Sequence, residues 1–159
     1  RLHDPAAERQ DADDSDSLAA TYKAMRDKVG ASFAEFAARL PKDGGHHRLL
    51  GTWGTVTTLA SVYLKLQSYD RRAVDGLHLP TEAMRTISRE LASRPIKGRA
   101  EFPTVGHERA DLVVAGCAIL EAIFDIWPGE RLGVADRGIR EGILRALMAS
   151  DAKRRNRRN

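Results

Sequence analysis

The sequence predicts a single helix-rich α/β domain in which a small sheet is flanked by long helices. The chain has 159 residues, which suits one domain with a core of reasonable size. Its composition of 42% apolar and 30% charged residues is ordinary for a globular protein. Short apolar runs alternate with longer segments in which apolar residues recur at helical spacing, and this alternation indicates strands followed by helices.

The first forty residues combine an acidic lead-in with a long amphipathic helix. Residues 1–17 are acidic and are expected to be irregular. A helix is expected to start at Asp16 or Ser17, which are good N-cap residues, and to end before Pro41. Its apolar residues recur at helical spacing and predict one buried face: Leu18, Tyr22, Met25, Val29, Phe33, Phe36 and Leu40.

The middle of the chain contains two short strands, each followed by a helix. Pro80 and Thr81 are expected to open the second of these helices, with Met84, Ile87 and Leu91 facing inward. Prolines and glycines break the segment that follows and predict a long loop. The expected elements are a strand over 47–50, a helix over 55–66, a polar connection over 69–76, an edge strand over 77–79 and the loop over 93–106.

The last third is expected to hold the most buried helix and strand. Residues 108–127 are apolar almost all round, which is typical of a helix that is buried on several sides. Residues 132–135 form a candidate buried strand. A final helix is expected to carry Ile139, Ile143, Leu144 and Leu147 on its inner side. The domain is thus expected to span 18–149, followed by a basic, disordered tail over 150–159.

Several function classes find no support in the sequence. His46 and His47 are adjacent and have no further ligand at metal-binding spacing, so no metal site is predicted. Cys117 lies within an apolar run, where a thiol is expected to be inert, and no Ser-His-Asp set is visible. No run approaches the ~18 apolar residues of a membrane span. A single cysteine and no visible signal peptide lead us to expect a cytoplasmic protein.

Three stretches remain as candidate binding segments. "GTWGT" (51–55) would place backbone N–H groups and hydroxyls at a helix start, where an anion can bind, or it is only a tight turn. "GHERAD" (106–111) offers Arg109 to an anion, or it forms an ion pair at a helix start. "VADRGIREG" (134–142) places Asp136 and Arg137 at the end of a strand, where α/β sheets bind ligands, or it is a charged turn.

In this order, the three stretches resemble the C-terminal half of the exopolyphosphatase/guanosine pentaphosphate phosphohydrolase (Ppx/GppA) family. The resemblance is carried by "LLGTWGTVTTLA", "ERADLVVAGCAILEAI" and "RLGVADRGIREGILRALM", and "YDRRAVDGLHLPTEAM" resembles the intervening segment. It covers about 22–148, and the basic ending is similar to that of alphaproteobacterial members.

The resemblance implies the C-terminal lobe of a two-lobed, actin-like (sugar kinase/Hsp70-type) ATPase fold, with phosphates bound between the lobes. The family is a bacterial group linked to the stringent response. It removes terminal phosphate from polyphosphate, or the 5′ γ-phosphate from pppGpp, with Mg²⁺. The resemblance implies that Gly51, Thr52, Gly54, Thr55 and Arg109 bind phosphate. Further cleft-lining candidates are Trp53, Asp136 and Arg137.

This sequence departs from the family in two ways. Trp53 occupies a position at which family members generally have a small residue. Nothing resembles the family's glycine-rich phosphate loops or its catalytic Glu, so no catalytic residue and no Mg²⁺ ligand is expected in this chain. We therefore expect the chain alone to be inactive and to need an absent N-terminal lobe. The alternatives are a non-catalytic nucleotide- or polyanion-binding module and an oligomerisation module.

Partners follow from the same expectations. Polyphosphate and guanosine penta- or tetraphosphate are the expected ligands, with no membrane and no specific nucleic acid. An open sheet edge and uncovered apolar faces would favour pairing with a second copy, so a homodimer is expected.

Overall fold

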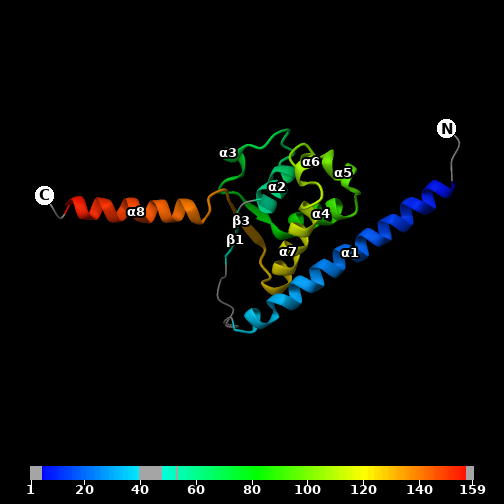
Figure 1. Cartoon of the computed structure of the whole chain (residues 1–159), viewed down its shortest axis with the longest axis horizontal. Helices are drawn as coiled ribbons and strands as arrows, with labels where there is room; N and C mark the ends of the chain where they lie inside the picture. The colour runs from blue at the N-terminus through cyan, green and yellow to red at the C-terminus, as the bar shows by residue number, and fades with distance from the viewer. Residues whose placement is uncertain (1–4, 40–47, 53, 157–159) are drawn as a thin grey trace.

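The computed structural model of the chain has a three-stranded sheet at its centre (Figure 1). It describes residues 5–39, 48–52 and 54–156, with the side chains of 16–39, 48–52 and 54–154. The strands are β1 (Leu49–Thr52), β2 (His78–Pro80) and β3 (Arg131–Ala135), in the order β1-β3-β2. β3 is parallel to β1 and antiparallel to β2, so the expected short edge strand is confirmed as β2.

The register of the two parallel strands brings their carboxyl ends together. Thr52 of β1 lies opposite Ala135 of β3. Gly54, which opens α2, and Asp136, which directly follows β3, therefore lie at the same edge of the sheet. Ligands of open α/β sheets bind at such an edge.

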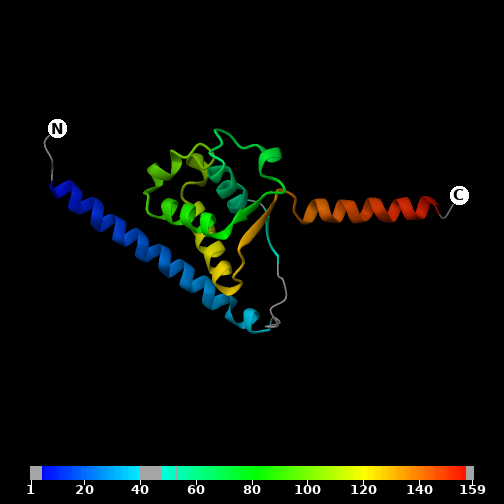
Figure 2. The same ribbon diagram turned by 180° about the vertical axis from the view of Figure 1, so that it is seen from behind.

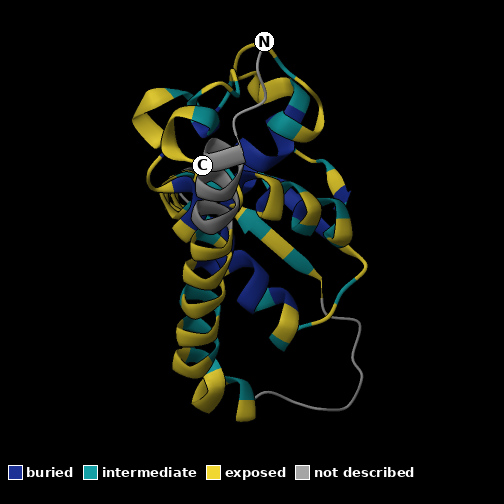
Figure 3. Cartoon of the chain, turned by 90° about the vertical axis from the view of Figure 1, so that its right-hand side faces the viewer, coloured by how far each residue is buried: buried dark blue, intermediate teal, exposed yellow. Residues whose placement is uncertain are grey.

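Helices cover the sheet, and α7 lies among them (Figure 1). Buried residues gather inside the molecule and exposed ones on its outer side (Figure 3). α7 (Val113–Ile126) packs against α1, α2 and α4, and Cys117 and Phe124 are among its buried residues. This confirms the prediction of a helix that is buried on several sides. The remaining helices are α1 (Pro5–Ala38), α2 (Gly54–Tyr63), α3 (Arg71–Val74), α4 (Thr81–Ala92), α5 (Ile96–Ala100), α6 (Gly106–Arg109) and α8 (Ile139–Asn156).

A buried carboxylate holds three helices together. Glu121 of α7 is fully buried. Its oxygens lie 3.2 Å from Arg26 of α1, and 3.5 and 3.6 Å from Arg85 and Arg89 of α4. Asp125, one turn further along α7, adds contacts of 2.8 Å to Arg26 and 2.9 Å to Arg85. The buried charge is thereby compensated, as buried charges must be.

Both ends of the chain differ from expectation. α1 begins at Pro5, so the prediction of an irregular lead-in is wrong for the residues that the structure describes. Proline suits the first helical position, and alanines and acidic residues favour the start of a helix. α8 continues to Asn156, so most of the tail that was expected to be disordered is helical.

The prediction of an inward apolar face on the last helix is also wrong. α8 projects from the body on the side opposite to the start of α1 (Figures 1 and 2). Ile139 is 79% exposed, and Ile143, Leu144 and Leu147 are 55–60% exposed. The apolar residues recur as predicted, but their side chains are mostly exposed and do not belong to the hydrophobic core of the described residues.

Smaller corrections concern the candidate binding segments. The first strand lies at 49–52 instead of 47–50, so Gly51 and Thr52 belong to β1 and not to a loop. α7 starts only at Val113, and Arg109 instead ends the separate short helix α6. α5 and the start of α6 also interrupt the predicted loop over 93–106.

Candidate functional site

A pocket of about 580 Å³ opens where the two parallel strands end. Gly54 and Thr57 line it from the start of α2, and Arg109 lines it from the end of α6. Asp136, which directly follows β3, completes the floor. The other lining residues are Gln67, Ser68, Tyr69, Arg71, Pro103, Thr104, Arg140 and Glu141.

The start of α2 places partial positive charge at this pocket. Gly54 has a φ of 25°, a conformation that favours glycine and that turns the chain tightly from β1 into α2. The first turn of α2 contains no acidic residue, so the partial positive charge of the helix start is not neutralised from within the helix. Thr57 Oγ1 donates a hydrogen bond of 3.1 Å to the Gly54 carbonyl, which steadies this turn.

Arg109 is held at the pocket by a neutral partner. Its Nη1 donates a hydrogen bond of 3.0 Å to Oγ1 of Thr58, a buried residue of α2. In the part of the chain that the structure describes, no carboxylate forms an ion pair with Arg109. The guanidinium is therefore positioned but its charge is uncompensated, which is the state in which an arginine can bind an incoming anion.

Asp136 is neutralised by Arg71. Arg71 Nε lies 2.8 Å from Asp136 Oδ2, and Arg71 Nη2 donates a hydrogen bond of 2.6 Å to the Asp136 carbonyl. Burial, together with a hydrogen bond to Asp136, raises the pKa of Tyr69 to about 12. The Asp136 N–H donates to Asp75 Oδ1 at 3.0 Å and thereby lowers the pKa of Asp75 below its usual range. Arg137 lies 3.5 Å from Asp75 and does not line the pocket.

A helix cap fixes the first turn of α8 at the rim. The Gly138 N–H donates a hydrogen bond of 2.8 Å to Glu141 Oε2, the reach-back half of a capping box. This bond is the main reason why the pKa of Glu141 lies below its usual range. Glu141 is thus engaged in capping the start of α8, and Arg140 lines the pocket from the same helical turn.

The structure brings only part of the predicted set together. Gly54, Arg109 and Asp136 share the pocket. A separate hollow of about 430 Å³ between β1 and α7 is lined by Gly51, Thr52 and Thr55, and Gly54 borders both spaces. Trp53 lies outside the described residues. The binding roles of all these residues stay predictions.

Several lining residues were not found by sequence reasoning. Arg71, Tyr69 and Thr104 come from connections that carry no recognisable binding pattern of their own. Their only signal was that Tyr69 and Arg71 lie in the polar segment that resembles the family. Tyr69 and Arg71 lie far from Arg109 and Asp136 in the sequence, and only the folded chain brings them into the same pocket.

The described residues do not form a metal centre. No group of three His, Cys, Asp or Glu side chains within the described ranges is placed to hold a metal ion. In the same ranges, no helix has the length and apolar composition required to cross a bilayer.

Comparisons with known proteins agree with the observed fold. A model of the Ppx/GppA phosphatase family matches residues 9–151. An Aquifex aeolicus Ppx/GppA family member matches with a TM-score of 0.66 and 24% identity over 82% of this chain and 40% of that one. An Aquifex aeolicus PPX-GPPA enzyme matches with a TM-score of 0.65 and 27% identity, covering 75% of this chain and 38% of that one.

An exopolyphosphatase from Cytophaga hutchinsonii shares the fold at 18% identity, with a TM-score of 0.65 over 79% of this chain and 42% of that chain. The chain thus spans about two fifths of the length of these structures. No curated protein sequence matches it. The predicted fold, the helix-rich C-terminal lobe of an actin-like ATPase fold, is confirmed by these neighbours. The chain belongs to the Ppx/GppA phosphatase family, of which it represents the C-terminal half.

Proposed function

We propose that this chain forms one wall of the substrate cleft of a phosphohydrolase that releases terminal phosphate from polyphosphate or from the 5′ end of pppGpp. The observation that carries the proposal is the placement of Arg109. Its guanidinium is held by a neutral hydroxyl, beside the start of α2, in a pocket at the carboxyl ends of the parallel strands. Family membership supports the same class of reaction.

The chain contributes binding and orientation rather than bond cleavage. Phosphoryl transfer requires clamped phosphate oxygens and a water molecule aimed in line with the leaving group. Arg109 and the N–H groups at the start of α2 would clamp the phosphate oxygens. Asp136 is paired with Arg71, and Glu141 accepts the Gly138 N–H, so neither carboxylate is placed as a base.

The remaining parts would come from an N-terminal lobe. We expect that lobe to supply the catalytic carboxylate and to hold the Mg²⁺. It would also cover part of the exposed apolar side of α8, which includes Leu144 and Leu147. This chain alone should accordingly bind phosphate without turning it over.

Binding and turnover test the proposal separately. Arg109→Ala should weaken tripolyphosphate binding by roughly tenfold or more, since a hydrogen bond to a charged group contributes about 1.5–3 kcal/mol. Arg145→Ala, an equally exposed arginine on α8 outside the pocket, is the matched control. A fall in Tm without a loss of affinity in Arg109→Ala would instead assign this residue a structural role.

Phosphate release from polyphosphate and pppGpp, with Mg²⁺, completes the test. Release only after addition of a family N-terminal lobe supports the proposal. Release by the chain alone would contradict our expectation of inactivity.

The alternative is a non-catalytic polyanion-binding or oligomerisation module of the same fold. The observation that favours it is α8, which projects with an exposed apolar stripe and ends in a basic segment. An exposed stripe of this kind favours association with a second copy. Tight tripolyphosphate binding without turnover in either form, together with a dimer in sedimentation, would support this alternative.

A further inference from the structure

The short helix α6, which carries Arg109, has no buried residue of its own. Gly106 is half-buried, and the other three residues of the helix are exposed. Most of the stability of a helix in a protein comes from packing of an apolar face, and a single turn is too short to persist without it. The position of Arg109 must therefore be set by contacts made on either side of α6.

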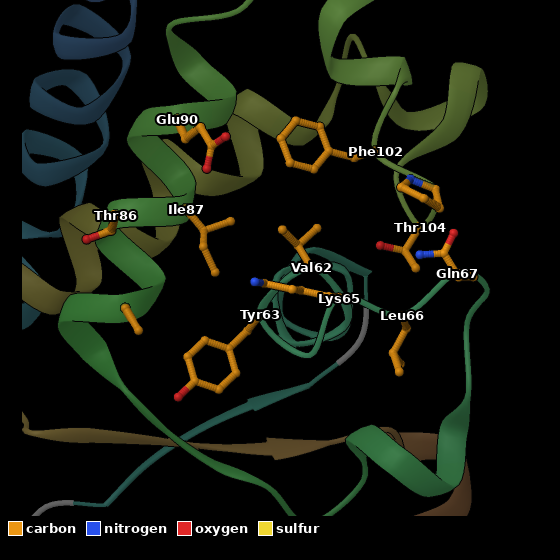
Figure 4. A pocket seen from close by; sticks show the side chains of 12 residues that line it. Val62, Tyr63, Lys65, Leu66, Gln67, Thr86, Ile87, Glu90, Phe102 and Thr104 are labelled. Atoms are coloured by element: carbon orange, nitrogen blue, oxygen red, sulfur yellow. The ribbon is translucent and has the colours of Figure 1, made fainter.

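The chain that leads into α6 is closely packed only at its end. Phe102 and Thr104, which connect α5 to α6, border a hollow of about 610 Å³ whose other sides are formed by the end of α2 and by α4 (Figure 4). Val105 and Ala110, the residues directly before and after α6, are buried. Apolar packing thus fixes the two ends of α6 but leaves the direction of its side chains open.

Arg99 of α5 is a buried cation for which the binding site gives no direct reason. Only 6% of its surface is exposed, and burial lowers the pKa of its guanidinium below the usual value. In the described part of the chain, no carboxylate forms an ion pair with it. Burying a charge without a counter-charge is costly, so Arg99 must do something that an apolar side chain would not.

The hydrogen bonds of Arg99 join the end of α4 to the residue that follows Arg109. Its Nε donates to the Leu91 carbonyl at 3.0 Å, and its Nη1 donates to the Ala110 carbonyl at 3.4 Å. Leu91 is fully buried in the core, so Arg99 fastens the end of α6 to a fixed part of the molecule.

Thr58 provides a second tether, at the tip of the Arg109 side chain. Its Oγ1 accepts the hydrogen bond of 3.0 Å from Arg109 Nη1, and Thr58 itself is buried within α2. Arg109 is thus held at its main chain through Ala110 and at its guanidinium through Thr58. Neither Arg99 nor Thr58 lines the pocket, so neither is placed to touch a ligand there.

We infer that Arg99 and Thr58 are positioning residues, which orient Arg109 towards an anion before the anion binds. A free arginine side chain loses conformational freedom when it binds a ligand, and prior tethering removes that cost. The Thr58 hydroxyl does this without neutralising the guanidinium, as a carboxylate would. The inference rests on the proposed function, because it requires that Arg109 binds phosphate.

Two substitutions of Thr58 separate positioning from stability. Calorimetry with tripolyphosphate on the full chain, in EDTA, measures the affinity, and circular dichroism measures the Tm. Thr58→Val keeps the shape but lacks the hydroxyl, so the affinity should fall roughly fivefold without a fall in Tm. Thr58→Ser keeps the hydroxyl but lacks a buried methyl group, so the affinity should be unchanged while the Tm falls by about 2–4 °C.

Arg99→Met tests the other tether, since methionine has similar length but no donor. The affinity for tripolyphosphate should fall roughly threefold to fivefold at 10 °C. In an Arg109→Ala background, Arg99→Met should cause no further loss, because Arg99 acts only through Arg109. Glu121→Leu is the matched control, because it removes a buried charge outside the pocket and should lower the Tm without changing the affinity.

Each result decides for or against the inference. An unchanged affinity in Thr58→Val, or in folded Arg99→Met, would overturn it for that residue. A further loss in the double variant would also overturn it, since Arg99 would then act elsewhere. If Arg99→Met does not fold, the opposite responses of the two Thr58 variants still decide. Failure of the proposed function is a different result, in which Arg109→Ala itself leaves the affinity unchanged.

Discussion

Gly116 marks the closest approach between the central helix α7 and the start of α2. A Cβ built on Gly116 lies 2.0 Å from Thr55 Oγ1 and 3.1 Å from Thr55 Cβ. Atoms at that separation overlap, so Gly116→Ala must push Thr55, and with it the turn that begins at Gly54, away from α7. Gly116→Ala therefore tests whether the close packing of Gly116 on Thr55 stabilises the contact between α7 and the start of α2.

The expected change in stability follows from a comparison with Gly30, a helical glycine that has free space around it. At Gly30 of α1, a built Cβ meets no atom within 4 Å, so Gly30→Ala should stabilise the protein by about 1 kcal/mol through helix propensity. Gly116→Ala gains the same propensity but loses about 1–3 kcal/mol to overpacking. A difference of about 2 kcal/mol between the two variants corresponds to a Tm difference of roughly 4–8 °C for a chain of this size.

Thermal unfolding followed by circular dichroism measures this difference. A double variant, Gly116→Ala with Thr55→Ala, should recover part of the loss, because the closest atom, Thr55 Oγ1, is then absent. If Gly116→Ala melts at the temperature of Gly30→Ala, the packing argument is refuted.

Two further predictions concern the buried groups between α1, α4 and α7. Glu121→Leu should lower the free energy of unfolding by about 3 kcal/mol, because three arginines lose their buried carboxylate partner. Unfolding in urea measures this change. Burial and the Glu121 carboxylate raise the pKa of Tyr22 above its usual value of 10. In the unfolded chain Tyr22 ionises near pH 10, whereas in the folded chain it keeps its proton to higher pH. The stability should therefore decline as the pH rises above about 10. Tyr22→Phe should show a smaller decline in urea titrations at pH 9 and 11, and an equal decline would contradict this assignment.

Local patterns in the sequence predicted much of the fold. The buried strand β3 and the buried helix α7 were expected from apolar composition, and the long amphipathic α1 from helical spacing. Such patterns can be recognised in one sequence because burial on a face repeats with the period of the backbone. The start of α1 and the end of α8 were predicted less well. Helix propensity alone marks no boundary within the Asp-rich start of the chain or its Arg-rich end.

The candidate site was predicted only in part. The stretches 51–55 and 106–111 of the sequence correctly drew attention to Gly54 and Arg109, which share the pocket. The register of β1 and β3 explains why Asp136 lies near them. Tyr69 and Arg71 could not be expected at this pocket, because they come from a connection whose position depends on the packed helices. The direction of Thr55, towards Gly116 and away from the pocket, is likewise a matter of packing between two helices.

The sequence by itself determined where the buried strand β3, the buried helix α7 and the middle of α1 lie and which family the chain resembles, because apolar periodicity and motif order can be recognised along the chain. Tertiary structure alone decided which charged side chains are compensated, as Asp136 is by Arg71 and Glu121 by three arginines, and which, like Arg109, are not. It also decided that α8 stands away from the body, although its apolar stripe was visible in the sequence. The physical reason is the same in both cases: a pattern shows that a side chain needs a partner, but only the packed chain shows whether one is there.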